Sequence, residues 1–135
     1  MEIKEIIQKN QGYNSNNLNV PKSLKATAQK LCFEYNQTGP DEAEKRREIL
    51  KNLLGKCSDL TFIEPSFHCD YGFNIFVDGL AVINYNCVIL DTSPVHIGAN
   101  AFTAPGVCIA CAGHSINPEQ RAKGISTSKP ITIGK

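Results

Sequence analysis

Small aliphatic residues recur with a period of six through the second half of the chain. This period matches neither one face of a helix nor the alternation of a simple strand. It predicts a hexapeptide β-helix, in which three short strands form each triangular coil and stacked coils share one core. The gaps after Cys69 and Ile89 are eight residues long, which indicates two-residue insertions, the second around Thr92–Pro94. The positions in phase are Ile63, Cys69, Val77, Ile83, Ile89, Ile97, Thr103, Ile109 and Ile133.

The chain before this repeat has a helical pattern. Apolar residues on one side of residues 1–10 predict a short helix, and longer helices are expected after Pro21 and after Asp41. Residues 11–19 are rich in Asn and Gly, and we expect a loop there. The apolar face of the helix after Pro21 consists of Leu24, Ala28, Leu31 and Tyr35.

We therefore predict a mainly β fold in which a small α-helical N-terminal region precedes a β-helix. The helical region is expected over residues 1–56 and the β-helix, which is incomplete, over residues 57–135. Residues 113–130 are polar and have no repeat, so they predict an extended loop, and loops of this length usually carry function. The coils are expected at residues 59–76, at 77–96 and from Ile97 onward.

Long segments of the chain resemble the sugar O-acetyltransferases of the hexapeptide-repeat superfamily, which include maltose, galactoside and nodulation acetyltransferases. The segments are "FHCDYGFNI", "INYNCVILD", "VHIGANAFTAPGVCI", "AGHSINPEQR" and "KPITIGK". The resemblance implies a left-handed parallel β-helix and an enzyme that transfers an acetyl group from acetyl-CoA to a small sugar acceptor. It also implies that the complete protein is a homotrimer.

His114, in the "GHS" segment, is the candidate general base. A sugar hydroxyl is a weak nucleophile at neutral pH, and histidine is the side chain whose pKa suits removal of its proton near pH 7. Such a base contributes about 10²–10⁴ in rate. The resemblance assigns this role to His114, whereas the residues alone are equally compatible with a surface histidine at the root of a loop.

The resemblance also implies contacts to the acceptor sugar. Carboxylate and amide groups are well suited to hydrogen-bond sugar hydroxyls, although Asp and Asn are also common in tight turns for structural reasons. Thr92 stands where the family often has a second acidic residue, so acceptor preference is expected to differ. The candidate sugar-binding residues are Asp70, Tyr71, Asn74, Asn84 and Asp91.

The donor site has no assigned residues. In the family the CoA arm lies between neighbouring subunits, along coils that follow the "ITIG" segment, and this sequence ends there. We expect a truncated sequence that binds acetyl-CoA poorly. The alternative to an active enzyme is a remnant that only binds sugar or associates with a full-length paralogue.

Composition excludes several other classes of function. The 135 residues carry a net charge of +1 and contain no Trp, which argues against a nucleic-acid surface. There is no apolar run long enough to span a membrane and no signal peptide, so we expect a cytoplasmic protein whose six cysteines are free thiols.

A metal site is not expected. The spacing of Cys108, Cys111 and His114 resembles part of a zinc site, but the repeat points Ile109 inward and therefore Cys108 outward. The zinc hydratases that share the β-helix need three converging histidines. His68 and His96 each precede an inward position, so both are expected at the surface.

Overall fold

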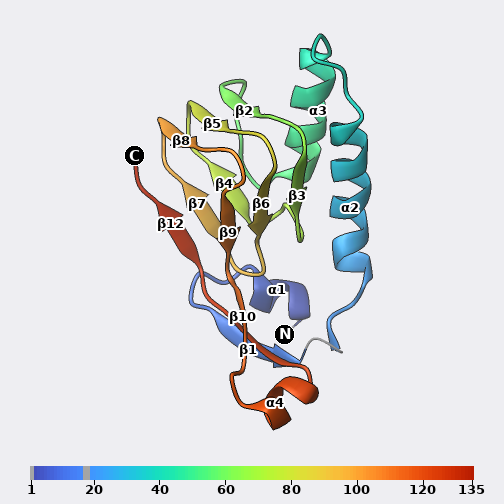
Figure 1. Ribbon diagram of the computed structural model, residues 1–135, viewed down its shortest axis with the longest axis vertical. Coiled ribbons are helices and arrows are strands. Elements are labelled where there is room, and N and C mark those ends of the chain that lie inside the picture. The colour runs from blue at the N-terminus through green and yellow to red at the C-terminus, as the bar shows by residue number, and fades with distance from the viewer. Residues whose placement is uncertain (1, 17–18) are drawn as a thin grey trace.

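The computed structural model describes residues 2–16 and 19–135 (Figure 1). Helices after Pro21 and Asp41 are confirmed, as is a short helix within residues 1–10. The expected loop at residues 11–19 is wrong in part, because it contains a short strand. The elements before the coils are α1 (Ile3–Ile7), β1 (Tyr13–Asn16), α2 (Ser23–Asn36) and α3 (Ala43–Leu53).

The second half of the chain forms a parallel β-helix. Its strands stack into parallel sheets in the orders β2-β5-β8, β3-β6-β9 and β4-β7-β12. Each coil contributes one strand to each sheet, so successive coils lie side by side (Figure 1). The strands are β2 (Thr61–Ile63), β3 (Phe67–Cys69), β4 (Ile75–Val77), β5 (Ala81–Ile83), β6 (Cys87–Leu90), β7 (Val95–Ile97), β8 (Ala101–Thr103), β9 (Cys108–Ala110) and β12 (Ile131–Ile133).

The six-residue phase explains the register of these sheets. Ile63 pairs with Ile83 and Ile83 with Thr103, and the other in-phase residues stack in the same way on the remaining two sheets. In-phase residues point into the coil and form most of its buried interior. The mainly β fold is therefore confirmed, and the two-residue insertion after Ile89 lies in the turn between β6 and β7.

Helices α2 and α3 pack against the first coil, on the side away from the C-terminus (Figure 1). The Tyr35 hydroxyl donates to the Ile63 carbonyl oxygen at 2.5 Å. The Asn36 side-chain amide donates to the Phe67 carbonyl oxygen at 3.0 Å and accepts from the Phe67 N–H at 2.9 Å. The helices thus occupy backbone groups that a further coil would otherwise pair, and they close this end of the β-helix.

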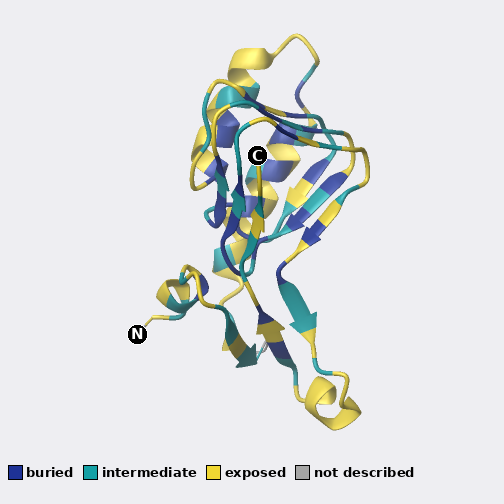
Figure 2. Ribbon diagram, turned by 90° about the vertical axis from the view of Figure 1, so that its left-hand side faces the viewer, coloured by how far each residue is buried: buried dark blue, intermediate teal, exposed yellow. Residues whose placement is uncertain are grey.

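The segment expected to be an extended loop at 113–130 contains regular secondary structure, so that prediction is wrong. It contains β10 (Ala112–His114), α4 (Pro118–Ala122) and β11 (Ile125–Ser128). These strands form an antiparallel sheet of order β1-β11-β10, which lies beyond the ends of the coils (Figure 1). Helix α4 at its tip is exposed (Figure 2).

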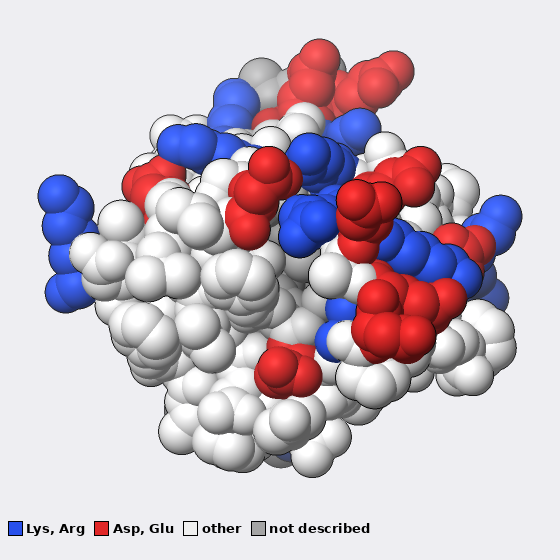
Figure 3. Space-filling model, turned by 90° about the horizontal axis from the view of Figure 1, so that it is seen from above, with Lys and Arg blue, Asp and Glu red and all other residues white. Residues whose placement is uncertain are grey.

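Charges of both signs are mixed on the surface. Figure 3 shows Lys and Arg beside Asp and Glu, with no large area of one sign on that face. Exposed ion pairs join Lys51 to Asp59 at 3.3 Å and Lys56 to Asp78 at 2.6 Å. Within residues 2–16 and 19–135, no helix has the length and apolar character needed to cross a membrane.

Candidate functional site

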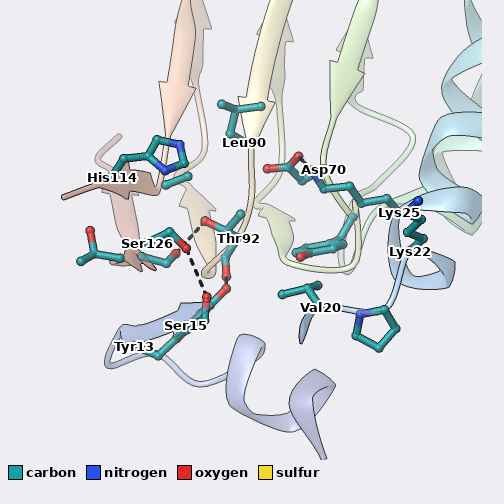
Figure 4. A pocket seen from close by; sticks show the side chains of 15 residues that line it. Tyr13, Ser15, Val20, Lys22, Lys25, Asp70, Leu90, Thr92, His114 and Ser126 are labelled. Atoms are coloured by element: carbon teal, nitrogen blue, oxygen red, sulfur yellow. Dashed lines mark hydrogen bonds and ion pairs between the residues drawn. The ribbon is translucent and has the colours of Figure 1, made fainter. Parts of the chain in front are cut away.

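A cavity of about 400 Å³ lies where the small antiparallel sheet meets the ends of the coils. One wall comes from the start of α2 and the residues before it, and a second from β1, β10 and β11. The turns that follow β3 and β6 complete it (Figure 4). The lining residues are Tyr13, Ser15, Val20, Pro21, Lys22, Lys25, Asp70, Tyr71, Leu90, Thr92, Ala112, His114, Ser126, Thr127 and Ser128.

His114 lies at the end of β10 and lines this cavity (Figure 4). Its backbone pairs with Ser126 of β11, so the antiparallel ladder fixes the position from which the imidazole extends. Its side chain is exposed, and no hydrogen bond joins it to another residue in the described part of the chain. The ring nitrogens are therefore available to a bound molecule.

Asp70 faces His114 across the cavity (Figure 4). One carboxylate oxygen lies 2.9 Å from the Lys25 ammonium group on α2, and the Asp70 side chain is only 12 % exposed, against 47 % for Lys25. The ion pair joins the turn after β3 to the wall formed by α2. An ion pair with one exposed partner contributes little to folding stability, so its main effect is to orient the carboxylate.

Asp91 lies beneath the wall, with no exposed surface. Its Oδ1 accepts the backbone N–H groups of Asp70 at 3.0 Å and Tyr71 at 2.9 Å, and its Oδ2 accepts that of Asn74 at 3.3 Å. Burial raises the pKa of this carboxyl to about 6, against the lowering effect of the backbone donors. The structure does not bring Asp91 to the cavity; it holds the turn that carries Asp70.

Asn74 and Tyr71 belong to the same turn. Asn74 is fully buried and donates from Nδ2 to the carbonyl oxygens of Ile7 at 3.0 Å and Asp91 at 3.1 Å, which fastens α1 to the first coil. It therefore does not face the cavity. Tyr71 does line it, although only 5 % of its surface is exposed, and its ring stacks on Phe73 at 5.1 Å. Burial raises the Tyr71 pKa.

Asn84 is not among the lining residues of the cavity. It follows β5 of the sheet β2-β5-β8, and its Oδ1 accepts the Tyr85 N–H at 2.8 Å. Within a single chain, the structure does not bring Asn84 together with Asp70 and His114, because the strand β5 ends at a different corner of the coil.

Hydroxyl side chains of Tyr13, Thr92 and Ser128 also line the cavity, and none of the three is among the predicted sugar-binding residues. The Tyr13 hydroxyl donates to the Thr92 carbonyl oxygen at 2.6 Å, and burial raises the Tyr13 pKa. The Ser128 hydroxyl lies 2.7 Å from that of Thr92 and 2.6 Å from that of Ser93. The recurrence of hydroxyl residues at every second position, as in Ser126 and Ser128, was the available signal for a strand that presents them together.

Cysteine and histidine do not form a metal cluster in the described ranges 2–16 and 19–135, where no group of three or more His, Cys, Asp or Glu side chains is placed to hold an ion. Cys108 is exposed and Cys111 is buried, with its Sγ donating to the Ser93 carbonyl oxygen at 3.4 Å. The prediction that Cys108 points outward is confirmed.

Comparisons with known proteins agree with this architecture. Residues 22–58 match the family model of the maltose acetyltransferase hexapeptide capping motif. The chain is 45 % identical over 101 residues to nodulation protein L of Rhizobium meliloti, covering 75 % of this chain. It spans 53–57 % of the length of the curated relatives that it matches at 44–45 % identity.

Solved structures extend the likeness over nearly the whole chain. A maltose O-acetyltransferase from Clostridium difficile 630 is 35 % identical, with a TM-score of 0.84, over 99 % of this chain and 74 % of that one. A hexapeptide-repeat acetyltransferase from Vibrio cholerae, solved in complex with acetyl coenzyme A, is 30 % identical. Its TM-score is 0.87 over 99 % of this chain and 72 % of that one.

Proposed function

Because the chain belongs to the hexapeptide-repeat family of sugar O-acetyltransferases, we propose that it transfers the acetyl group of acetyl-CoA to a hydroxyl of a small sugar. His114 is the general base in this proposal. The observation that carries it is the position of an exposed imidazole at a cavity of about 400 Å³, a volume within the range of small-molecule pockets.

The lining of the cavity supports a polyhydroxylated acceptor. The Asp70 carboxylate accepts hydrogen bonds, while Ser15, Thr92 and Ser126 offer hydroxyls that both donate and accept. Asp91 and Asn74 act as positioning residues in this proposal, because they are buried and hold the turn from behind. We place Tyr71 against a face of the acceptor ring, where its limited exposed surface can contact carbon-bound hydrogens.

The chemical step follows from this arrangement. The acceptor hydroxyl lies beside the His114 imidazole, which takes its proton as the oxygen attacks the carbonyl carbon of the thioester. The carbon–sulfur bond breaks and the acetyl group remains on the acceptor oxygen. The imidazolium then returns the proton to the CoA thiolate, so the base is regenerated within one turnover.

We further propose that the working enzyme is a homotrimer and that Asn84 contacts the acceptor held by a neighbouring subunit. The outward side chains Phe62, Val82 and Phe102 stand in register on β2, β5 and β8. Phe62 is 48 % and Phe102 66 % exposed, and an exposed apolar row of this kind is typical of an interaction surface. Asn84 follows β5 directly, at one end of this row.

The test is acetyl transfer by the purified chain with acetyl-CoA and a panel of glucose, maltose and galactosides. We expect a sugar heavier by one acetyl group, detected by mass spectrometry, together with sugar-dependent release of CoA. A control without sugar is needed because the six cysteines also react with thiol reagents. Sugar binding without any acetylated product would instead support a remnant that only binds sugar.

A further inference from the structure

Two cysteines far apart in the chain meet where α2 contacts the first coil. Cys32 of α2 is 3 % exposed, and Cys69, at the end of β3, is partly buried. Their Sγ atoms lie 3.7 Å apart. Since the sulfur atoms of a disulfide are about 2 Å apart, a small approach of the two side chains is enough to join them.

The two thiols differ in character. A hydrogen bond from the Cys69 thiol lowers the pKa of Cys32, whereas the same contact together with burial raises the pKa of Cys69. The contact therefore favours the thiolate at Cys32 over the thiolate at Cys69. Since the thiolate is the nucleophilic form, this contact favours Cys32 as the sulfur that attacks an oxidant.

We propose that a peroxide oxidises Cys32 and Cys69 to a reversible disulfide that fastens α2 to β3. The Cys32 sulfur attacks one oxygen of hydrogen peroxide, the O–O bond breaks, and Cys32 becomes a sulfenic acid with release of one water. The Cys69 sulfur then attacks the Cys32 sulfur, the S–O bond breaks, and a second water leaves. Two thiols are oxidised by two electrons, and one peroxide is reduced to two waters.

Peroxide is the oxidant that fits this site, because it is small enough to reach a largely buried pair. The other buried thiols have different neighbours. Cys87 donates to the Ala104 carbonyl oxygen at 3.3 Å, and Cys111 donates to that of Ser93 at 3.4 Å. Cys108 is exposed and serves as an internal reporter of unselective oxidation.

The bond would act next to the cavity. Cys69 precedes Asp70, whose carboxylate is paired with Lys25 of the same helix that carries Cys32. A covalent link between α2 and β3 therefore restrains the helix that forms one wall. We expect the amide protons of α2 to exchange more slowly in the oxidised protein, because opening of the helix away from the coil is blocked.

The experiment oxidises the reduced full chain with stepwise additions of hydrogen peroxide and then blocks the remaining thiols with N-ethylmaleimide. Digestion with trypsin and a protease that cuts after acidic residues separates Cys69 from Cys57 and Cys87, because Asp59 and Asp70 lie between them. We expect one linked peptide pair that contains Cys32 and Cys69, lighter by two hydrogens and reversed by dithiothreitol. Hydrogen exchange of α2 should slow in the same sample.

Matched variants separate this bond from general oxidation. The linked pair should persist in Cys108→Ser and disappear in Cys32→Ala, where Cys69 is recovered with the blocking group. Recovery of Cys32 and Cys69 as separately blocked peptides while Cys108 is oxidised would overturn the proposal. So would a bond that leaves exchange of α2 unchanged. If Cys32→Ala does not fold, the peptide map of the unmodified chain decides alone.

Discussion

Replacement of Asp91 by Asn tests whether a buried carboxylate holds the wall of the cavity. The carboxyl accepts the N–H groups of Asp70, Tyr71 and Asn74 and has no exposed surface. Asn keeps one oxygen for Asp70 and Tyr71, but it presents an NH₂ group to the Asn74 N–H in place of Oδ2. At pH 4 this lost contact should lower the free energy of unfolding by about 1–3 kcal/mol.

The effect of Asp91→Asn should change with pH. The pKa of Asp91 is raised from its ordinary 3.8 to about 6 by burial, so the folded state holds this proton more tightly than the unfolded state. The stabilisation that comes from this tighter proton binding is therefore fully present below pH 3.8. It is lost as the pH rises through about 6. At about 1.4 kcal/mol for each unit of pKa difference, the decrease amounts to about 3 kcal/mol.

The assay is urea unfolding of the wild-type and Asp91→Asn proteins at several pH values between 4 and 7. Other titrating groups are shared, so the difference between the two curves isolates Asp91. We expect Asn to be the less stable residue at pH 4 and the two proteins to converge, or to exchange order, by pH 7. A stability deficit of Asp91→Asn that stays constant or grows with pH would refute this reasoning.

Three further changes test other parts of the account. Asn36→Ala removes two hydrogen bonds to the Phe67 backbone and should lower the free energy of unfolding by about 2–4 kcal/mol in urea titrations. Glu34 is exposed on the same helix, so Glu34→Ala should have little effect. Lys25→Ala removes the partner of Asp70 and should raise the acceptor KM about 2–5-fold with little change in kcat, whereas Lys30→Ala should leave KM unchanged. A fall in kcat alone would contradict a role of Lys25 in acceptor orientation. Phe102→Ser should shift a trimer toward monomer in light scattering, whereas Phe33→Ser, which removes an equally exposed ring from α2, should not.

The coils were predictable from the sequence because their burial depends on a local repeat. A residue such as Ile83 points inward at the same step of every coil, and its stacking partners Ile63 and Thr103 are found by counting along the chain. The sheet β1-β11-β10 offered no such signal. It pairs Ser15 with Ser126, which are remote in sequence, and its short strands have polar side chains that resemble a loop.

The candidate site was predictable only in part. The resemblance singled out His114, Asp70 and Tyr71, which line the cavity, and their roles stay predictions. The resemblance also placed Asp91 and Asn74 beside the sugar, but both are buried, and their burial depends on tertiary contacts such as that of Asn74 with Ile7. For the same reason the contribution of α2 to the wall was missed, although the helix itself was predicted.

The central claim is that His114 removes a proton from a sugar hydroxyl during acetyl transfer. The most direct measurement compares acceptor-dependent turnover of acetyl-CoA by the wild-type protein, His114→Ala and His68→Ala, since His68 is exposed on β3 and does not line the cavity. We predict that kcat falls by about 10²–10⁴ in His114→Ala and is unchanged in His68→Ala. Wild-type turnover by His114→Ala, or an equal loss in both variants, would contradict the account.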